Sequence, residues 1–154
     1  MNNVRKVGGQ VKIRRARAGD LPALVALDER VTHVAKDEYW KDLFEQFAAR
    51  QDHRMVLLAE VGGRVVGFII GEVRAWEFGE PPCGWIFGAN IDPDYRERGI
   101  GSALFEKVTL FFRECGVTKV RTMMRRDANL IMSFFRSQGL TSGPFIQLER
   151  DIDE

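Results

Sequence analysis

A twelve-residue stretch in the middle of the chain has the residue types that bind an anion. Residues 91–102 read IDPDYRERGIGS, with Gly99 and Gly101 where a helix is expected to begin. Glycine has no Cβ, so an anion can approach the backbone, and the first N–H groups of a helix have no intrahelical acceptor. Arg96 and Arg98 add positive charge beside these groups. The pattern indicates a phosphate or pyrophosphate site; the alternative is a turn that merely starts a helix.

Two common nucleotide motifs do not fit this stretch. A dinucleotide-binding motif needs G-x-G-x-x-G directly after a first strand, and a P-loop needs Gly-Lys before its Ser or Thr. Here the spacing is Arg96-x-x-Gly99-x-Gly101, late in the chain, and no lysine precedes Ser102. Both alternatives are therefore poor.

The elements that must position this stretch follow from hydrophobic spacing. The sequence predicts, in order, a strand at 11–17, helices at 21–31 and 38–50, strands at 55–61, 65–76 and 85–91, a helix at 99–115, a strand at 117–124, a helix at 129–138 and a last strand at 145–152. A helix joins strands 85–91 and 117–124, so these two strands are expected to be parallel neighbours.

Composition limits the classes of protein that the chain can represent. Its 154 residues carry 23 Lys+Arg and 22 Asp+Glu, a net charge of +1, which argues against a general nucleic-acid binder. No apolar run is long enough to span a bilayer, and two cysteines without ligand-spaced histidines predict no metal site and a cytoplasmic protein. We expect a loose tail at 1–10 and a single domain at 11–154.

The motif and the order of the elements resemble the GNAT superfamily of N-acetyltransferases, whose signature is Gln/Arg-x-x-Gly-x-Gly/Ala. Arg96, Gly99 and Gly101 match that signature, and the resemblance covers residues 11–151. It implies an α/β fold: a mixed, mostly antiparallel central sheet with a parallel, splayed strand pair and flanking helices. It also implies acetyl-CoA as the acetyl donor and cosubstrate.

The resemblance further implies which residues hold the cosubstrate. The backbone of strand 85–91 would pair with the pantetheine arm, and Gly88 within it suggests a bulge or a close ligand approach. The expected cofactor-binding residues are Ala89, Asn90, Ile91, Arg96, Arg98, Gly99, Ile100, Gly101, Ser102 and Asn129.

The catalytic residues depart from the family pattern. The family often has a Tyr that protonates the leaving thiolate, but Phe135 stands at that position and has no proton to give. Asn129 lies close to the position of a family Asn. No acidic residue lies between Trp85 and Asn90, where many members place a Glu, so Glu72 on the preceding strand is the candidate base. Glu72 as a solvated strand carboxylate is the alternative.

The sequence leaves several assignments open. Loop carboxylates, histidines and a phenol offer further acids or bases: Glu77, Glu80, His33, His53 and Tyr39. The leading hypothesis is direct acetyl transfer to a primary amine of a small molecule or protein. The alternatives are a non-catalytic acyl-CoA-binding regulatory module and, more weakly, a phosphate-binding domain. A homodimer is plausible, and no membrane or nucleic-acid partner is expected.

Overall fold

The computed structural model describes residues 10–153, so almost all of the predicted tail at 1–10 lies outside the described residues. The strands are β1 (Lys12–Arg15), β2 (Arg54–Val61), β3 (Arg64–Arg74), β4 (Cys83–Ile91) and β5 (Val120–Thr122). The helices are α1 (Leu21–Thr32), α2 (Asp37–Ala49), α3 (Ile100–Glu114) and α4 (Asn129–Ser137). The chain divides into two compact units, one up to Met123 and one from Met124 onward.

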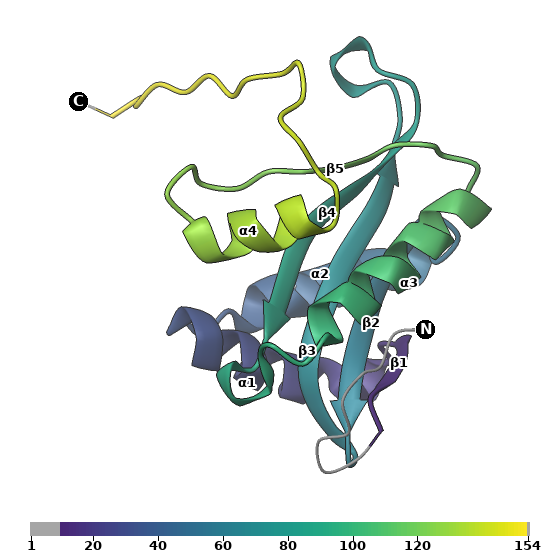
Figure 1. Ribbon diagram of the computed structural model, residues 1–154, viewed down its shortest axis with the longest axis vertical. Helices are drawn as coiled ribbons and strands as arrows, with labels where there is room; N and C mark the ends of the chain where they lie inside the picture. The colour runs from purple at the N-terminus through teal and green to yellow at the C-terminus, as the bar shows by residue number, and fades with distance from the viewer. Residues whose placement is uncertain (1–9, 154) are drawn as a thin grey trace. The chain divides into compact units, whose positions relative to one another are not determined.

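The first unit is built on a five-stranded sheet in the order β1-β2-β3-β4-β5. The first three neighbouring pairs are antiparallel, and β4 and β5 are parallel. Helices α1 and α2 lie on one face of this sheet and α3 on the other (Figure 1). The predicted mixed α/β fold, with its parallel last pair, is confirmed.

Alternation along β3 separates the two cores. Phe68 and Ile70 are almost fully buried in a cluster with Leu24 and Trp40 of α1 and α2. Gly71 points the other way, where an added Cβ would lie 2.8 Å from atoms of α3 side chains. Because residues two apart share a face of a strand, β3 supplies side chains to one helical layer and close backbone contact to the other.

An acidic residue at the start of α1 ties the helix to the sheet. Asp20 Oδ1 and Oδ2 accept from Arg14 Nη2 and Nη1, each at 2.7 Å, and Oδ2 also accepts from Arg17 N at 2.7 Å. Arg14 lies on β1 and also bonds Glu60 of β2. These hydrogen bonds, led by the one from Arg14, lower the pKa of Asp20 below its ordinary value of 3.8.

The second unit contains α4 and an irregular C-terminal segment. The predicted helix at 129–138 is confirmed, but the predicted last strand at 145–152 is wrong, because residues 141–153 form no strand. The segment has the apolar alternation of a strand at Ile146, Leu148 and Ile152, and all three side chains are exposed. Alternation of apolar and polar residues is typical of a half-buried strand, but a strand also needs a neighbouring strand for its backbone hydrogen bonds.

Among the described residues, no helix is long and apolar enough to cross a membrane.

Candidate functional site

The loop between β4 and α3 presents a helix N-terminus with an open approach. Gly99 caps α3 with φ of 78°, a left-handed conformation that glycine adopts without strain, and an added Cβ would meet no atom within 4 Å. The bond from Ala103 N to Gly99 O, at 3.0 Å, starts the helical ladder. The amides of Ile100 and Gly101 precede this first helical bond, and the helix dipole favours an anion there.

Aromatic and basic side chains surround this loop. The Arg98 guanidinium carbon lies 5.2 Å from the ring centroid of Tyr95, and that of Arg64 lies 5.9 Å from the same centroid. Arg96 is exposed on the loop. Three arginines thus raise the positive potential near the start of α3, although the whole chain is almost neutral.

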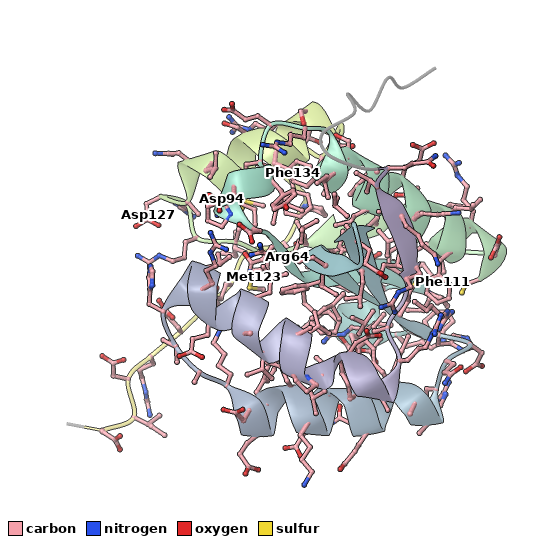
Figure 2. All side chains as sticks on the ribbon, turned by 90° about the horizontal axis from the view of Figure 1, so that it is seen from below. Arg64, Asp94, Phe111, Met123, Asp127 and Phe134 are labelled. Atoms are coloured by element: carbon pink, nitrogen blue, oxygen red, sulfur yellow. The ribbon has the colours of Figure 1, made fainter. Side chains whose placement is uncertain are left out.

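A buried carboxylate, which sequence reasoning missed, fixes the start of the loop. Asp92 is 1% exposed; its Oδ2 accepts from Arg30 Nη1 at 2.9 Å and Arg64 Nη2 at 3.2 Å, and its Oδ1 from Asp94 N at 3.0 Å. Arg64 and Asp94 are labelled in Figure 2. An Asp directly before Pro93 was the available signal, since Asp often caps a helical turn that opens with Pro. Asp92 joins α1, β3 and the loop at one point.

The edge of β4 that leads into this loop is open. Pairing with β5 covers Gly84–Ile86, where Thr122 Oγ1 also donates to Ile86 O at 2.8 Å. Beyond Ile86, the ladder with β5 ends, and residues 88–91 pair with β3 alone among the described residues. The two parallel strands therefore pair over three residues only, Gly84–Ile86 with Val120–Thr122. An extended ligand can therefore add to this edge as a further strand does.

A bulge marks the point where the splay begins. Ile70 pairs with Gly88 and Gly71 with Ile86, so Phe87 is the extra residue on β4. A Cβ on Gly88 would lie 2.8 Å from Ile70 Cδ1, which explains the glycine there. The irregularity expected at Gly88 is confirmed, one residue wide and next to the open edge.

The candidate base Glu72 lies away from the open edge. It pairs in register with Trp85, and its Oε1 accepts from Arg54 Nε at 2.9 Å. Ala89 pairs with Ile69, three residues earlier on β3, so about 10 Å of strand separates the two positions. Of the other candidate carboxylates, Glu77 lies 3.7 Å from Arg74 and Glu80 3.2 Å from Arg121.

The remaining predicted site residue belongs to the second unit. Asn129 is the first residue of α4, and its backbone N donates to Asp127 O at 2.9 Å. Phe135, six residues later on the same helix, is 3% exposed. Its buried phenyl ring fills a core position and offers no proton, as the sequence predicts.

A metal cluster is absent from the described residues, and the best-formed cavity lies away from the predicted site residues. Residues 10–153 hold no group of three His, Cys, Asp or Glu side chains that could bind a metal ion. A cavity of about 250 Å³ lies between β1, β2 and α3, lined by Arg15, Leu57 and Phe111 among others, and includes no predicted site residue. Phe111 is labelled in Figure 2.

Comparisons with known proteins agree with this geometry. Residues 21–139 match the family model described as the acetyltransferase (GNAT) family. An acetyltransferase of Sodalis glossinidius is 28% identical over 127 residues, 81% of this chain and 83% of that protein. An L-2,4-diaminobutyric acid acetyltransferase of Nocardia farcinica is 29% identical over 109 residues, 68% of this chain and 55% of that protein.

A solved structure has the same fold. The aminoglycoside N-acetyltransferase AAC(6')-Iy, in complex with CoA, superposes with a TM-score of 0.83 at 17% identity and covers 96% of this chain and 98% of its own.

Proposed function

Because the chain belongs to the acetyltransferase (GNAT) family, we propose that it transfers the acetyl group of its cosubstrate acetyl-CoA directly to a primary amine. One observation carries this proposal. The unpaired edge of β4, residues 87–91, runs through a buried Asp92 into the glycine-opened N-terminus of α3. A strand edge followed by an anion site matches a ligand with an extended amide arm followed by a pyrophosphate.

The residues of the site fit acetyl-CoA in two places. The open backbone edge along Ala89, Asn90 and Ile91 offers hydrogen bonds to the amides of the pantetheine arm. The amides of residues 100–102 and the open space at Gly99 suit the pyrophosphate, and Arg96 and Arg98 supply compensating charge. We assign cosubstrate binding to these positions, with Asn129 as an additional hydrogen-bonding candidate.

The chemistry asks little of the protein's own side chains. Acetyl-CoA supplies an activated acyl group: the new C–N bond forms as the C–S bond breaks, and the proton lost by the amine balances the thiolate released. The chain must orient the amine, accept or relay its proton, and exclude competing water. We keep Glu72 as the candidate base, acting through water because of its distance along β3. With Phe135 in place of a Tyr, the thiolate takes its proton from solvent or the ammonium.

We infer that the acceptor is a small cationic amine. The support is indirect: the relatives named for a substrate act on diaminobutyric acid and aminoglycosides, both of which carry several amino groups. The free thiols of Cys83 and Cys115 are compatible with the reducing cytoplasm that we propose as the location.

One paired experiment tests the proposed function. CoA binding is measured by calorimetry, and release of free thiol from acetyl-CoA is then followed with a panel of amines. We expect binding, and turnover with at least one aliphatic primary amine. Absence of CoA binding would refute the assignment of the site, whereas tight binding without turnover on any amine would favour a non-catalytic acyl-CoA-binding module.

A further inference from the structure

A second buried carboxylate lies beside the open edge of β4, outside the proposed cosubstrate site. Asp28 of α1 is 4% exposed. Its Oδ2 accepts from Lys36 Nζ at 3.0 Å and Trp40 Nε1 at 3.1 Å, and its Oδ1 accepts from Asn90 Nδ2 at 3.2 Å. Residues from α1, from the connection between α1 and α2, from α2 and from β4 therefore meet on one carboxyl group.

The hydrogen bond between Asp28 and Asn90 fixes which way the Asn90 amide faces. A carboxylate has no proton to donate, so the Asn90 group that meets it must be the NH₂, and the carbonyl Oδ1 must face away. No donor among residues 10–153 reaches that Oδ1. Thr109 Oγ1 is the one buried side-chain oxygen without a partner in the described part of the chain, so Asn90 Oδ1 is not closed off from solvent. An acceptor oxygen is thus held open on the strand proposed to carry the acyl donor.

The same carboxylate already holds a primary alkylammonium group. The side chain of Lys36 is 35% exposed, and its Nζ lies 3.0 Å from Asp28 Oδ2. Its chemistry is that of an aliphatic amine substrate in its protonated form. The negative field of Asp28 also extends to the phenol of Tyr39, where burial and then the charge of Asp28 raise the pKa. The charge of Lys36 therefore cancels the field of Asp28 only in part, and the remainder attracts a cation that binds beside Asn90.

We propose that Asn90 Oδ1 binds the acceptor amine, and that Asp28 is the positioning residue that orients this amide and selects protonated aliphatic amines. The inference rests on the proposed function for the place of the acyl donor, because Asn90 lies within the open segment of β4. It assigns the acceptor side of the reaction to the face of the sheet that carries α1 and α2, on which Asn90 faces its strand partner Phe68. Lys36 is the built-in competitor for the charge of Asp28.

The first measurement reads the subsite without any turnover. Trp40 Nε1–H donates to Asp28, so its ¹H–¹⁵N indole signal reports on that carboxylate; the signal is assigned with Trp40→Phe among the three tryptophans. Titration with 1,4-diaminobutane at constant ionic strength is expected to shift the signal in the wild type. The same titration is expected to leave it in place in Asp28→Asn, and aniline, neutral at pH 7, is expected to leave it in place in both proteins.

The second measurement separates the two roles by kinetics. At saturating acetyl-CoA, Asp28→Asn is expected to raise KM for an aliphatic amine about tenfold and to change KM for an arylamine less than about twofold, because the loss is one of charge. Asn90→Ala is expected to raise KM for both amines, and Lys36→Met to lower KM for the aliphatic amine. Calorimetric affinity for CoA should stay within about twofold of wild type in all three, since the β4 backbone is intact.

A matched control guards against loss of stability as the cause. Asp20→Asn also removes a largely buried, arginine-paired carboxylate, but at the other end of α1, and is expected to leave both KM values unchanged. Equal losses on aliphatic and aromatic amines in Asp28→Asn, or an unmoved Trp40 signal in the wild type, would overturn the acceptor subsite. Failure of CoA to bind to the wild type would instead refute the proposed function, while the amine titration still tests Asp28.

Discussion

Gly101 lies where a side chain added by substitution would interfere most directly with anion binding. It follows the cap Gly99 in the first turn of α3, where the helix dipole favours an anion. We predict that Gly101→Glu abolishes CoA binding in calorimetry, because its carboxylate would occupy the place of the pyrophosphate and repel it. Gly19→Glu adds the same charge at a glycine with open space around it and should bind CoA as wild type does. Normal CoA affinity in Gly101→Glu would move the pyrophosphate elsewhere.

Glu72 can be tested by its effect on the pH dependence of turnover. If it relays the proton of the amine, Glu72→Gln lowers kcat at neutral pH by about tenfold or more, and the loss shrinks as pH rises and more amine is already deprotonated. The measurement is a kcat profile from pH 6 to pH 10 at saturating substrates. A profile with the shape and height of the wild type would leave Glu72 with a structural role only, as the ion-pair partner of Arg54 and Arg74.

Single residues were predictable where the reason for them is local. Gly99 is needed for a left-handed cap, and its position follows from the spacing of a short motif. Asp28 and Asp92 were not predictable, because each owes its role to partners more than 60 positions away or on other elements: Asn90 for Asp28, and Arg30 for Asp92. Composition and hydrophobic periodicity do not reveal contacts between side chains that are distant in the sequence.

At the scale of elements, β4 and α3 touch with no space for a side chain between them. A Cβ on Gly84 would lie 2.5 Å from Phe112 Cδ2 and within 2.7 Å of two further ring atoms. We predict that Gly84→Ala lowers the free energy of unfolding by about 2 kcal/mol, because a buried ring must move aside. Urea unfolding checks this, with Gly19→Ala as the control that meets no atom within 4 Å. An unchanged urea midpoint would mean that α3 tolerates displacement from the sheet.

The link between β1 and α1 gives stability a defined pH dependence. The pKa of Asp20 is lowered in the folded protein, so the unfolded chain takes up the proton first as pH falls. The stabilisation is complete at neutral pH and is lost as pH falls through the ordinary value of 3.8 toward the lower folded value. We predict that Asp20→Asn costs about 1 kcal/mol at pH 7, and that the difference from wild type narrows as pH falls below 3.8. Urea unfolding at pH 7 and pH 3 measures it; a difference as large at pH 3 as at pH 7 would contradict the prediction.

The elements themselves were predicted well where hydrophobic spacing is local. The ranges of α1, α2, α3 and α4 agree with the sequence to within two residues, because each has an apolar face and a clear start. The strand predicted at 117–124 shrinks to Val120–Thr122, since pairing with β4 stops at Ile86. Where strand length depends on a neighbour, the sequence of one strand is insufficient.

At the scale of the whole molecule, the C-terminal segment leaves apolar side chains without cover. Ile146, Leu148 and Ile152 are 78%, 85% and 84% exposed. We propose that a second copy of the chain covers them, and predict a particle of twice 17.6 kDa in light scattering after size exclusion. A chain that ends at Leu140 should be monomeric. A monomeric full chain, or a truncated chain that still dimerises, would refute this.

The open edge of β4 has a cost for the protein outside its reaction. Alternate residues along this edge direct their backbone N–H and C=O groups outward and form a template for an extended peptide, and unprotected edges of this kind seed aggregation. If acetyl-CoA occupies this edge as proposed, it blocks such pairing. The purified protein is therefore expected to aggregate more slowly during storage when acetyl-CoA is present. The supply of acetyl-CoA in the cell would protect the same edge.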